Sequence, residues 1–338
     1  MLATSPDSFE ANQGAGMALD LMGKQDDART HFAKAVTAAS KPEDKLAAER
    51  ATVVSYGFAG NCQGADQFAS KPYNADLDGG QFGPAGDLGF DVARVCFNAG
   101  NLDLAEKWFR MSYAAALQDG NMKTPEKNLW DFRWNAAMAR VDTLRAKAAA
   151  VKAKADAEAK AAEAAKADKD KDKDKKKDKD KKKDKDKDKD KNAKGDKNAK
   201  GEQAANAAQG EAKEAQAKKP AAEAAPKPLS DEETPQKRMA AAAAALAKGV
   251  PGNNAAQLSA WLTGSVAFDQ GDYQKATTEL AKADQSDPRV LALTAQAYEK
   301  LGDKAQAQTY YQKVLTSTAH TPANAWARPL AQKALGKA

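Results

Sequence analysis

Small and bulky apolar residues recur along the chain at a spacing that predicts pairs of packed α-helices. A glycine is followed five residues later by alanine and, four residues further on, by a usually bulky apolar residue. The pattern occurs five times, at Gly23/Ala28/Phe32, Gly60/Ala65/Ala69, Gly100/Ala105/Phe109, Gly271/Ala276/Leu280 and Gly302/Ala307/Tyr311. Glycine ends the first helix because it tolerates positive φ, and the alanine methyl group then allows the second helix to approach closely. Five helical hairpins are predicted.

The first helix of each hairpin carries a matching residue seven positions before the glycine. These residues are Gly16, Val53, Ala93, Gly264 and Ala295. Pro288 follows the second helix of its hairpin and stops it, since proline cannot continue a helix interior.

The pattern resembles that of the tetratricopeptide repeat family, whose signature pairs small residues at the helix crossing with a closing proline. The best matches are AWLTGSVAFDQGDYQKATTELAKADQSDP at 260–288, QAYEKLGDKAQAQTYYQKVL at 296–315 and GMALDLMGKQDDARTHFAKAV at 16–36. The family repeats about every 34 residues, whereas these glycines lie 37 and 40 residues apart in the N-terminal group and 31 apart in the C-terminal pair. The extra length before Gly100 predicts a glycine-rich loop at 74–87.

The chain is predicted to be all-α and to have three parts. Two short tetratricopeptide-like arrays, at 5–150 and 235–338, each end in a capping helix. The apolar stripes of these caps are Trp130, Trp134, Met138 and Val141, and Trp326, Leu330 and Ala334. Between the arrays, 151–234 is a low-complexity stalk rich in Ala, Lys and Asp, expected to be largely disordered or a single helix. The Asp/Lys alternation at 168–191 favours an extended chain or a fraying helix.

The positive charge is concentrated in this stalk. The chain carries a net charge of +6, and the tract 168–191, with fourteen Lys and ten Asp, contributes +4 of it. The alternating signs cancel beyond a Debye length of about 8 Å, so nonspecific nucleic-acid binding through the stalk is a weaker hypothesis and no specific nucleic-acid partner is expected. The longest apolar run, 240–247, is shorter than the roughly 18 residues of a membrane span.

The residue pattern does not predict an enzyme. It contains no phosphate-binding glycine loop and no readable pairing of a nucleophile with a base. His31 and His320 lie far apart and are interpreted as surface polar residues. Asn74-x-Asp76-x-Asp78-Gly79 begins like an EF-hand calcium loop, but its twelfth position is Ala85 instead of a bidentate glutamate. No cofactor or metal is expected, and a small-molecule ligand is disfavoured.

Cys62 and Cys96 leave two alternatives, a disulfide between neighbouring repeats or two buried free thiols. The N-terminus has neither the basic nor the apolar segment of a secretory leader. The expectation is a cytoplasmic location, or the cell envelope or periplasm if a leader precedes this chain.

The family resemblance implies a protein–protein interaction scaffold that binds a peptide or helix of an unidentified protein partner in a concave groove. Carrying over the family's groove positions gives these partner-binding residues: Arg50, Phe58, Asp87, Phe90, Arg94, Phe97, Asn98, Leu258, Trp261, Ser265, Phe268 and Asp269. The alternative is a structural spacer in which the stalk holds two helical modules apart.

Overall fold

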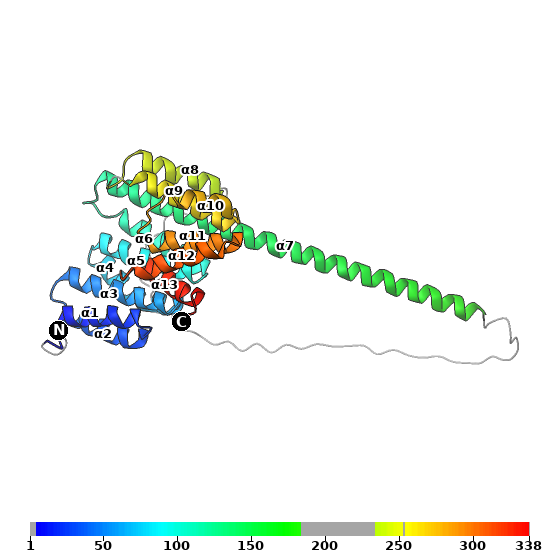
Figure 1. Cartoon of the computed structure of the whole chain (residues 1–338), viewed down its shortest axis with the longest axis horizontal. Coiled ribbons are helices and arrows are strands. Elements are labelled where there is room, and N and C mark those ends of the chain that lie inside the picture. Colours follow the sequence, from blue (N-terminus) through cyan, green and yellow to red (C-terminus); the bar gives the residue numbers. More distant parts are fainter. Residues whose placement is uncertain (1–4, 184–233, 253, 338) are drawn as a thin grey trace, which may run out of the picture. The chain divides into compact units, whose positions relative to one another are not determined.

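In the computed structural model, residues 5–183, 234–252 and 254–337 are described, with the side chains of 164–183 left aside. Every regular element in these ranges is an α-helix (Figure 1). The helices are α1 (Phe9–Leu21), α2 (Gln25–Ala38), α3 (Pro42–Phe58), α4 (Cys62–Asp78), α5 (Phe82–Asn98), α6 (Leu102–Ala116), α7 (Thr124–Lys183), α8 (Pro235–Ala247), α9 (Ala255–Gln270), α10 (Tyr273–Leu280), α11 (Pro288–Leu301), α12 (Lys304–Thr316) and α13 (Pro322–Ala334). The predicted all-α class is confirmed.

The chain divides into two compact units. We call Met1–Lys147 together with Ala224–Ala338 the core unit, and Ala148–Glu223 the second unit. The two ranges predicted as arms, 5–150 and 235–338, therefore lie mainly within one folded body. Whether the helices of this body form two separate arrays of repeats, one at 5–150 and one at 235–338, remains a prediction.

The predicted glycines do end helices. All five have positive φ: 80° at Gly23, 62° at Gly60, 78° at Gly100, 92° at Gly271 and 84° at Gly302. Two residues after each of them a new helix begins, and an Asn or Asp side chain caps four of these five helices, as Asn101 does for α6. These hairpins follow from local chemistry, because only glycine adopts this left-handed conformation without a steric cost.

The crossing residues are buried as their spacing predicts. Ala28, Ala65, Ala105 and Ala276 have no exposed surface, and Ala307 is 2% exposed. The bulky partner in the following turn, such as Phe32 or Leu280, is fully buried as well. Small and large side chains thus interlock at each crossing, the arrangement that gives interiors their high packing density.

The predicted loop at 74–87 is wrong. Helix α4 continues to Asp78 and α5 already begins at Phe82. Gly80, with φ of 70°, makes the same turn as the other closing glycines, and Ala85 follows it by five residues. Gly86 lies inside α5, where a Cβ would stand 3.0 Å from Cβ of Ala116, so this glycine allows two helices to touch.

Helix α7 has two buried faces in the core unit. Trp134, Met138 and Val141, members of the predicted capping stripe, pack against α5 and α6. Phe132 and its neighbours on the opposite face pack against α8 and α9. This first part of α7 therefore joins the N-terminal helices to the C-terminal ones.

Polar contacts reinforce this junction. Asn128 donates hydrogen bonds through Nδ2 to the carbonyl oxygens of Lys248 and Gly249, at 3.2 and 2.7 Å. Lys147 Nζ donates to the backbone oxygen of Asp269 at 3.0 Å. The linked residues are more than 100 positions apart in the sequence, so the junction depends on long-range contacts.

A second junction involves the last helix, α13, which packs against α3 (Figure 1). The side chain of His320, just before α13, is 3% exposed, and its Nε2 lies 2.7 Å from Oδ2 of Asp20 at the end of α1. Phe32 and Phe58 flank the imidazole, with ring centroids 5.4 and 5.6 Å away. The interpretation of His320 as a surface residue is wrong, because the closure of the core unit buries it.

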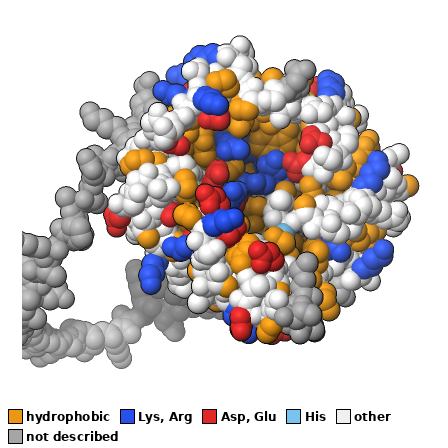
Figure 2. Space-filling model, turned by 90° about the vertical axis from the view of Figure 1, so that its left-hand side faces the viewer, with side chains coloured by type: hydrophobic (Ala, Val, Ile, Leu, Met, Phe, Trp, Pro, Cys, Tyr) orange, Lys and Arg blue, Asp and Glu red, His pale blue; other side chains and the backbone are white. Residues whose placement is uncertain are grey.

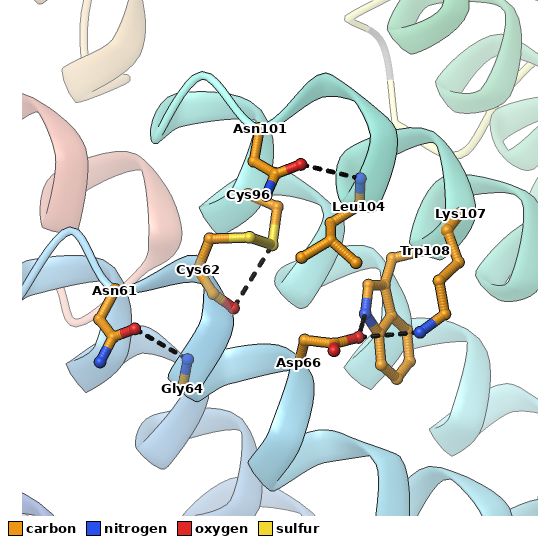
Figure 3. Close-up of a disulfide and its surroundings, with 9 residues drawn as sticks. All are labelled: Asn61, Cys62, Gly64, Asp66, Cys96, Asn101, Leu104, Lys107 and Trp108. Atoms are coloured by element: carbon orange, nitrogen blue, oxygen red, sulfur yellow. Dashed lines mark hydrogen bonds and ion pairs between the residues drawn. A yellow bond between two sulfur atoms is a disulfide. The ribbon is translucent and has the colours of Figure 1, made fainter. Parts of the chain in front are cut away.

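Cys62 and Cys96 form a disulfide between the start of α4 and the end of α5 (Figure 3). The sequence left this pairing open. One turn along α4, Oδ1 of Asp66 accepts hydrogen bonds from Nε1 of Trp108 at 2.7 Å and from Nζ of Lys107 at 2.9 Å. Trp108 is fully buried, and its indole proton therefore has the partner that a buried donor requires.

The part of the predicted stalk that the structure describes is helical. Helix α7 continues through the second unit to Lys183, and its side chains are exposed from Ala148 to Glu163. The Asp/Lys tract is thus helical up to that residue, whereas its alternation favoured an extended or fraying chain. The remainder of the stalk, 184–233, lies outside the described residues.

Candidate functional site

A cleft in the core unit is lined by helices that are distant in sequence. We call it the arginine cleft, and its volume is about 250 Å³. Its lining residues are Phe90, Arg94, Phe97, Asn98, Phe109, Leu129, Phe132, Arg133, Ala137, Arg140, Asn254, Leu258, Trp261 and Arg289. A hollow of this composition, with basic side chains beside acidic ones on a hydrophobic floor, lies near the centre of the face drawn in Figure 2.

The arginines of the cleft lie over aromatic rings. The guanidinium carbon of Arg140 is 4.6 Å from the ring centroid of Phe97, and that of Arg289 is 5.0 Å from Trp261. Arg133 lies over both Phe90 and Trp130, at 5.3 and 4.9 Å. Such cation–π contacts hold the guanidinium planes against the walls, and they leave the outer edges of these groups for hydrogen bonding.

Two of the arginines are paired with carboxylates. Nε and Nη2 of Arg140 donate to the two oxygens of Asp269 at 2.7 and 3.1 Å. Nε of Arg289 donates to both oxygens of Asp287 at 3.2 and 3.0 Å, and its Nη2 donates to Oδ2 at 2.5 Å. Burial alone would raise the pKa of Asp287, but Arg289 outweighs it and the pKa lies below its usual value.

A third set of charges forms the rim. Arg50 donates through Nε to Oδ2 of Asp91 at 2.8 Å, and its Nη1 lies 3.5 Å from Asp87. Arg133 approaches the other oxygen of Asp87 at 3.9 Å. Burial raises the pKa of Asp87, an effect that Arg50 and Arg133 oppose. Asp87 is therefore shared between Arg50 and Arg133, and Arg50 also binds Asp91.

Arg94 is the least compensated cation. Among the described residues, no carboxylate lies within ion-pair distance of it, and its contact with the Phe90 ring is loose at 6.0 Å. Burial, together with the positive charge of Arg289, lowers the pKa of Arg94 to about 9. Burial also lowers the pKa of Arg133. A lowered pKa means that the surroundings destabilise the charged form, which a bound anion would offset.

Six of the twelve residues predicted from the family's groove positions line the arginine cleft. They are Phe90, Arg94, Phe97, Asn98, Leu258 and Trp261. The first four come from α5 and the other two from α9, so the structure brings together positions predicted in two separate repeats. Arg50 and Asp87 belong to the adjoining rim.

The remaining four predicted residues lie elsewhere or have structural contacts. Ser265 is fully buried and donates to the carbonyl oxygen of Leu262 at 3.1 Å, and Asp269 is buried against Arg140. Phe268 packs on Tyr273, with ring centroids 5.5 Å apart, and borders a smaller cavity beside the cleft.

Phe58 lines a separate cavity between α3 and α13, with Gly57, Pro322 and Ala325 among its neighbours. Asn98 lines both this cavity and the arginine cleft, whereas Phe58 lines only the former.

The cleft residues of α7 and α11 were not among the predicted site residues. Phe132, Arg133 and Arg140 belong to a helix that was interpreted only as a cap, and Arg289 directly follows a helix-starting proline. A signal was present for α7: Leu129, Phe132, Ala136 and Ala139 have helical spacing on the face opposite the predicted stripe. No comparable local signal marks Arg289.

Metal binding and membrane insertion have no structural support in the described part of the chain. Within it, no group of His, Cys, Asp or Glu side chains has the geometry of a metal site. No helix of this part combines the length and the apolar character that crossing a membrane requires.

Comparison with known families places a repeat at the cleft. Residues 288–320 match the sequence model of the tetratricopeptide repeat. These residues form a tetratricopeptide repeat. The family resemblance inferred from the sequence is thereby confirmed for these residues, and the matched repeat comprises α11 and α12 and contributes Arg289 to the cleft. Comparison with curated proteins gives no match. Tetratricopeptide repeats are helical scaffold modules that generally mediate protein interactions.

Proposed function

We propose that this protein is a non-catalytic scaffold that binds a peptide or helical segment of a protein partner in the arginine cleft. The observation that carries the proposal is the convergence of family groove positions from two repeats. Phe90, Arg94 and Phe97 on α5 line the same hollow as Leu258 and Trp261 on α9.

The composition of the cleft supports a protein partner. Aromatic residues and arginine are enriched at the energetic centres of protein interfaces, and both dominate this lining. The polar lining groups are arginine and asparagine side chains. Neither group acts as a nucleophile or a general base at neutral pH, which supports binding without catalysis.

The spacer alternative has less support. It requires two helical modules held apart, whereas α7 packs against α8 and α9 and α13 packs against α3. Any function of the stalk 151–234 would then be added to that of a single folded core unit.

The experiment is affinity capture from a lysate of the source cells with the full chain as bait. A Trp261→Ala variant reduces the apolar wall of the cleft, and Met22→Ala is the control because Met22 is 66% exposed and lies outside the cleft. We expect one discrete, salt-resistant partner with the wild type and the control, and at least a tenfold lower yield with Trp261→Ala. Crosslinks from the partner should fall on α5 and α9. Equal capture by all three baits would contradict the proposal, provided that circular dichroism shows the same helix content for each.

We further infer that the protein works in an oxidising compartment. The inference rests on the disulfide between Cys62 and Cys96, because structural disulfides persist mainly in such compartments. Rapid alkylation of source cells followed by mass spectrometry should leave both cysteines unmodified unless the sample is first reduced. Full alkylation without a reductant would contradict the inference.

A further inference from the structure

The charges around the arginine cleft are unbalanced. The cleft and its rim contain five arginines, at 50, 94, 133, 140 and 289, and four aspartates, at 87, 91, 269 and 287. All four aspartates are paired with Arg50, Arg133, Arg140 or Arg289. The unmatched positive charge is therefore located at Arg94, inside the hollow.

We propose that the arginine cleft recognises an acidic side chain of the partner, with its carboxylate between Arg94 and Arg133 and an adjacent apolar side chain against Leu258 and Trp261. This inference rests on the proposed function and specifies the chemistry of the bound segment. Arginine suits such a role because its planar fork donates two parallel hydrogen bonds to one carboxylate. The aspartates at the rim oppose a second negative charge, so one acidic residue in an otherwise uncharged, apolar segment fits best.

The size of the cleft agrees with a short protein segment. Its volume of about 250 Å³ is slightly below the range of roughly 300–1,000 Å³ typical of pockets for whole small-molecule ligands. One acidic and one apolar side chain of a peptide would fill such a space while the peptide backbone stays outside. Of the two arginines proposed to bind the carboxylate, Arg133 is held against the rings of Phe90 and Trp130, so it needs little reordering on binding.

A nucleic acid fits this cleft less well. Single-stranded nucleic acids bind by stacking bases on aromatic faces, whereas guanidinium groups already cover the faces of Phe97 and Trp261. The rim aspartates, Asp87 and Asp91, would also repel a continuous phosphate backbone. A single carboxylate meets neither obstacle.

The test uses pools of eight-residue peptides with blocked ends and a dansyl label, a fluorophore without a carboxylate, so that the only carboxylate is a side chain. The central pair is fixed as Glu-Leu, Gln-Leu, Lys-Leu or Glu-Ser, and the other positions are mixed without Asp or Glu. A further Gln-Leu pool keeps a free C-terminus, and a labelled oligothymidine tests nucleic acid.

The fluorescence anisotropy of each labelled probe is measured while the full chain, or its Arg94→Gln variant, is added. Lys127→Gln, on the exposed surface of α7, is the matched loss of one positive charge.

We expect the Glu-Leu pool to bind at least about tenfold more tightly than the Gln-Leu and Lys-Leu pools, the fold-change expected for one charge-assisted hydrogen bond. The Glu-Ser pool should also bind more weakly, because it lacks the apolar side chain that Leu258 and Trp261 would bury. Arg94→Gln should abolish the preference for Glu over Gln, and Lys127→Gln should keep it. Equal binding of Glu-Leu and Gln-Leu would overturn the inference while leaving the peptide-binding function intact. Stronger binding of the free C-terminus or of oligothymidine would also overturn it. If no pool binds and the lysate experiment yields no partner, both proposals fail.

Discussion

The crossing of α9 and α10 in the core unit provides a sharp test of the packing argument. Gly264, in the middle of α9, faces α10. A Cβ at this position would lie 2.7 Å from Cγ and 2.9 Å from the backbone nitrogen of Leu280, which is fully buried. The perturbation is Gly264→Ala. Gly14→Ala is the matched control, because Gly14 lies inside α1 with no atom within 4 Å of its would-be Cβ.

Both substitutions gain helix propensity, but only Gly264→Ala also introduces a steric clash. Alanine is better than glycine in a helix interior by about 1 kcal/mol, so Gly14→Ala should stabilise the protein by about that amount. At Gly264 the same gain is opposed by overpacking, which costs about 1–3 kcal/mol. The upper end applies because a backbone atom, unlike a side-chain tip, cannot rotate away. The net result is about 2 kcal/mol of destabilisation, so the variants should differ by about 3 kcal/mol.

Thermal unfolding followed by circular dichroism measures this difference. For a folded unit of this size, 1 kcal/mol corresponds to roughly 2–4 °C in Tm, so the Tm of Gly264→Ala should be about 6–12 °C below that of Gly14→Ala. A Tm for Gly264→Ala equal to that of the control would refute the claim that backbone contact at this crossing requires glycine.

Three further predictions concern the contacts that close the core unit. Reducing the disulfide between Cys62 and Cys96 frees a loop of 34 residues and should lower the free energy of unfolding by about 4 kcal/mol; urea titrations with and without reductant measure this, and a double Cys→Ala variant should not respond to reductant. Arg140→Gln leaves Asp269 buried without its cation and should cost about 3 kcal/mol, with a smaller loss in the double variant that also carries Asp269→Asn; equal losses would show that the two residues are not coupled. His320→Ala removes a buried hydrogen bond and the packing of the imidazole, so it should destabilise the protein by about 2–4 kcal/mol in the same assay; a cost below about 1 kcal/mol would contradict the tight closure of α13 on α3.

The hairpins were predictable because their determinants are local. The pattern reflects contacts within one pair of helices. It consists of a closing glycine, an alanine five residues later and a bulky residue four residues beyond the alanine. The same rule could have identified Gly80 and Ala85, but the surrounding glycines favoured a loop. In the structure those glycines, such as Gly86, allow helices to approach closely.

The junctions between distant segments were not predictable in the same way. Asp20 and His320 meet across 300 residues, and neither residue carries a local pattern that reveals the other. The apolar residues of α7 that pack against α8 and α9 have helical spacing. Several of them are alanines, however, and they are not distinguishable from the alanine-rich sequence that follows. The groove positions on α5 and α9 were found because the family resemblance supplied them. Arg133, Arg140 and Arg289 enter the cleft only through tertiary packing.

The docking of α13 on α3 has a consequence for biosynthesis. During translation, α3 emerges from the ribosome long before α13, because about 260 residues separate the end of α3 from the start of α13. At translation rates of about 5–20 residues per second, this interval lasts roughly 10–50 s. During that time the surface of Gly57, which finally lies against Ala325, stays uncovered on the nascent chain. The stalk lengthens this delay, so completion of the core unit is a post-translational step and the unfinished intermediate offers chaperones a defined apolar surface to bind.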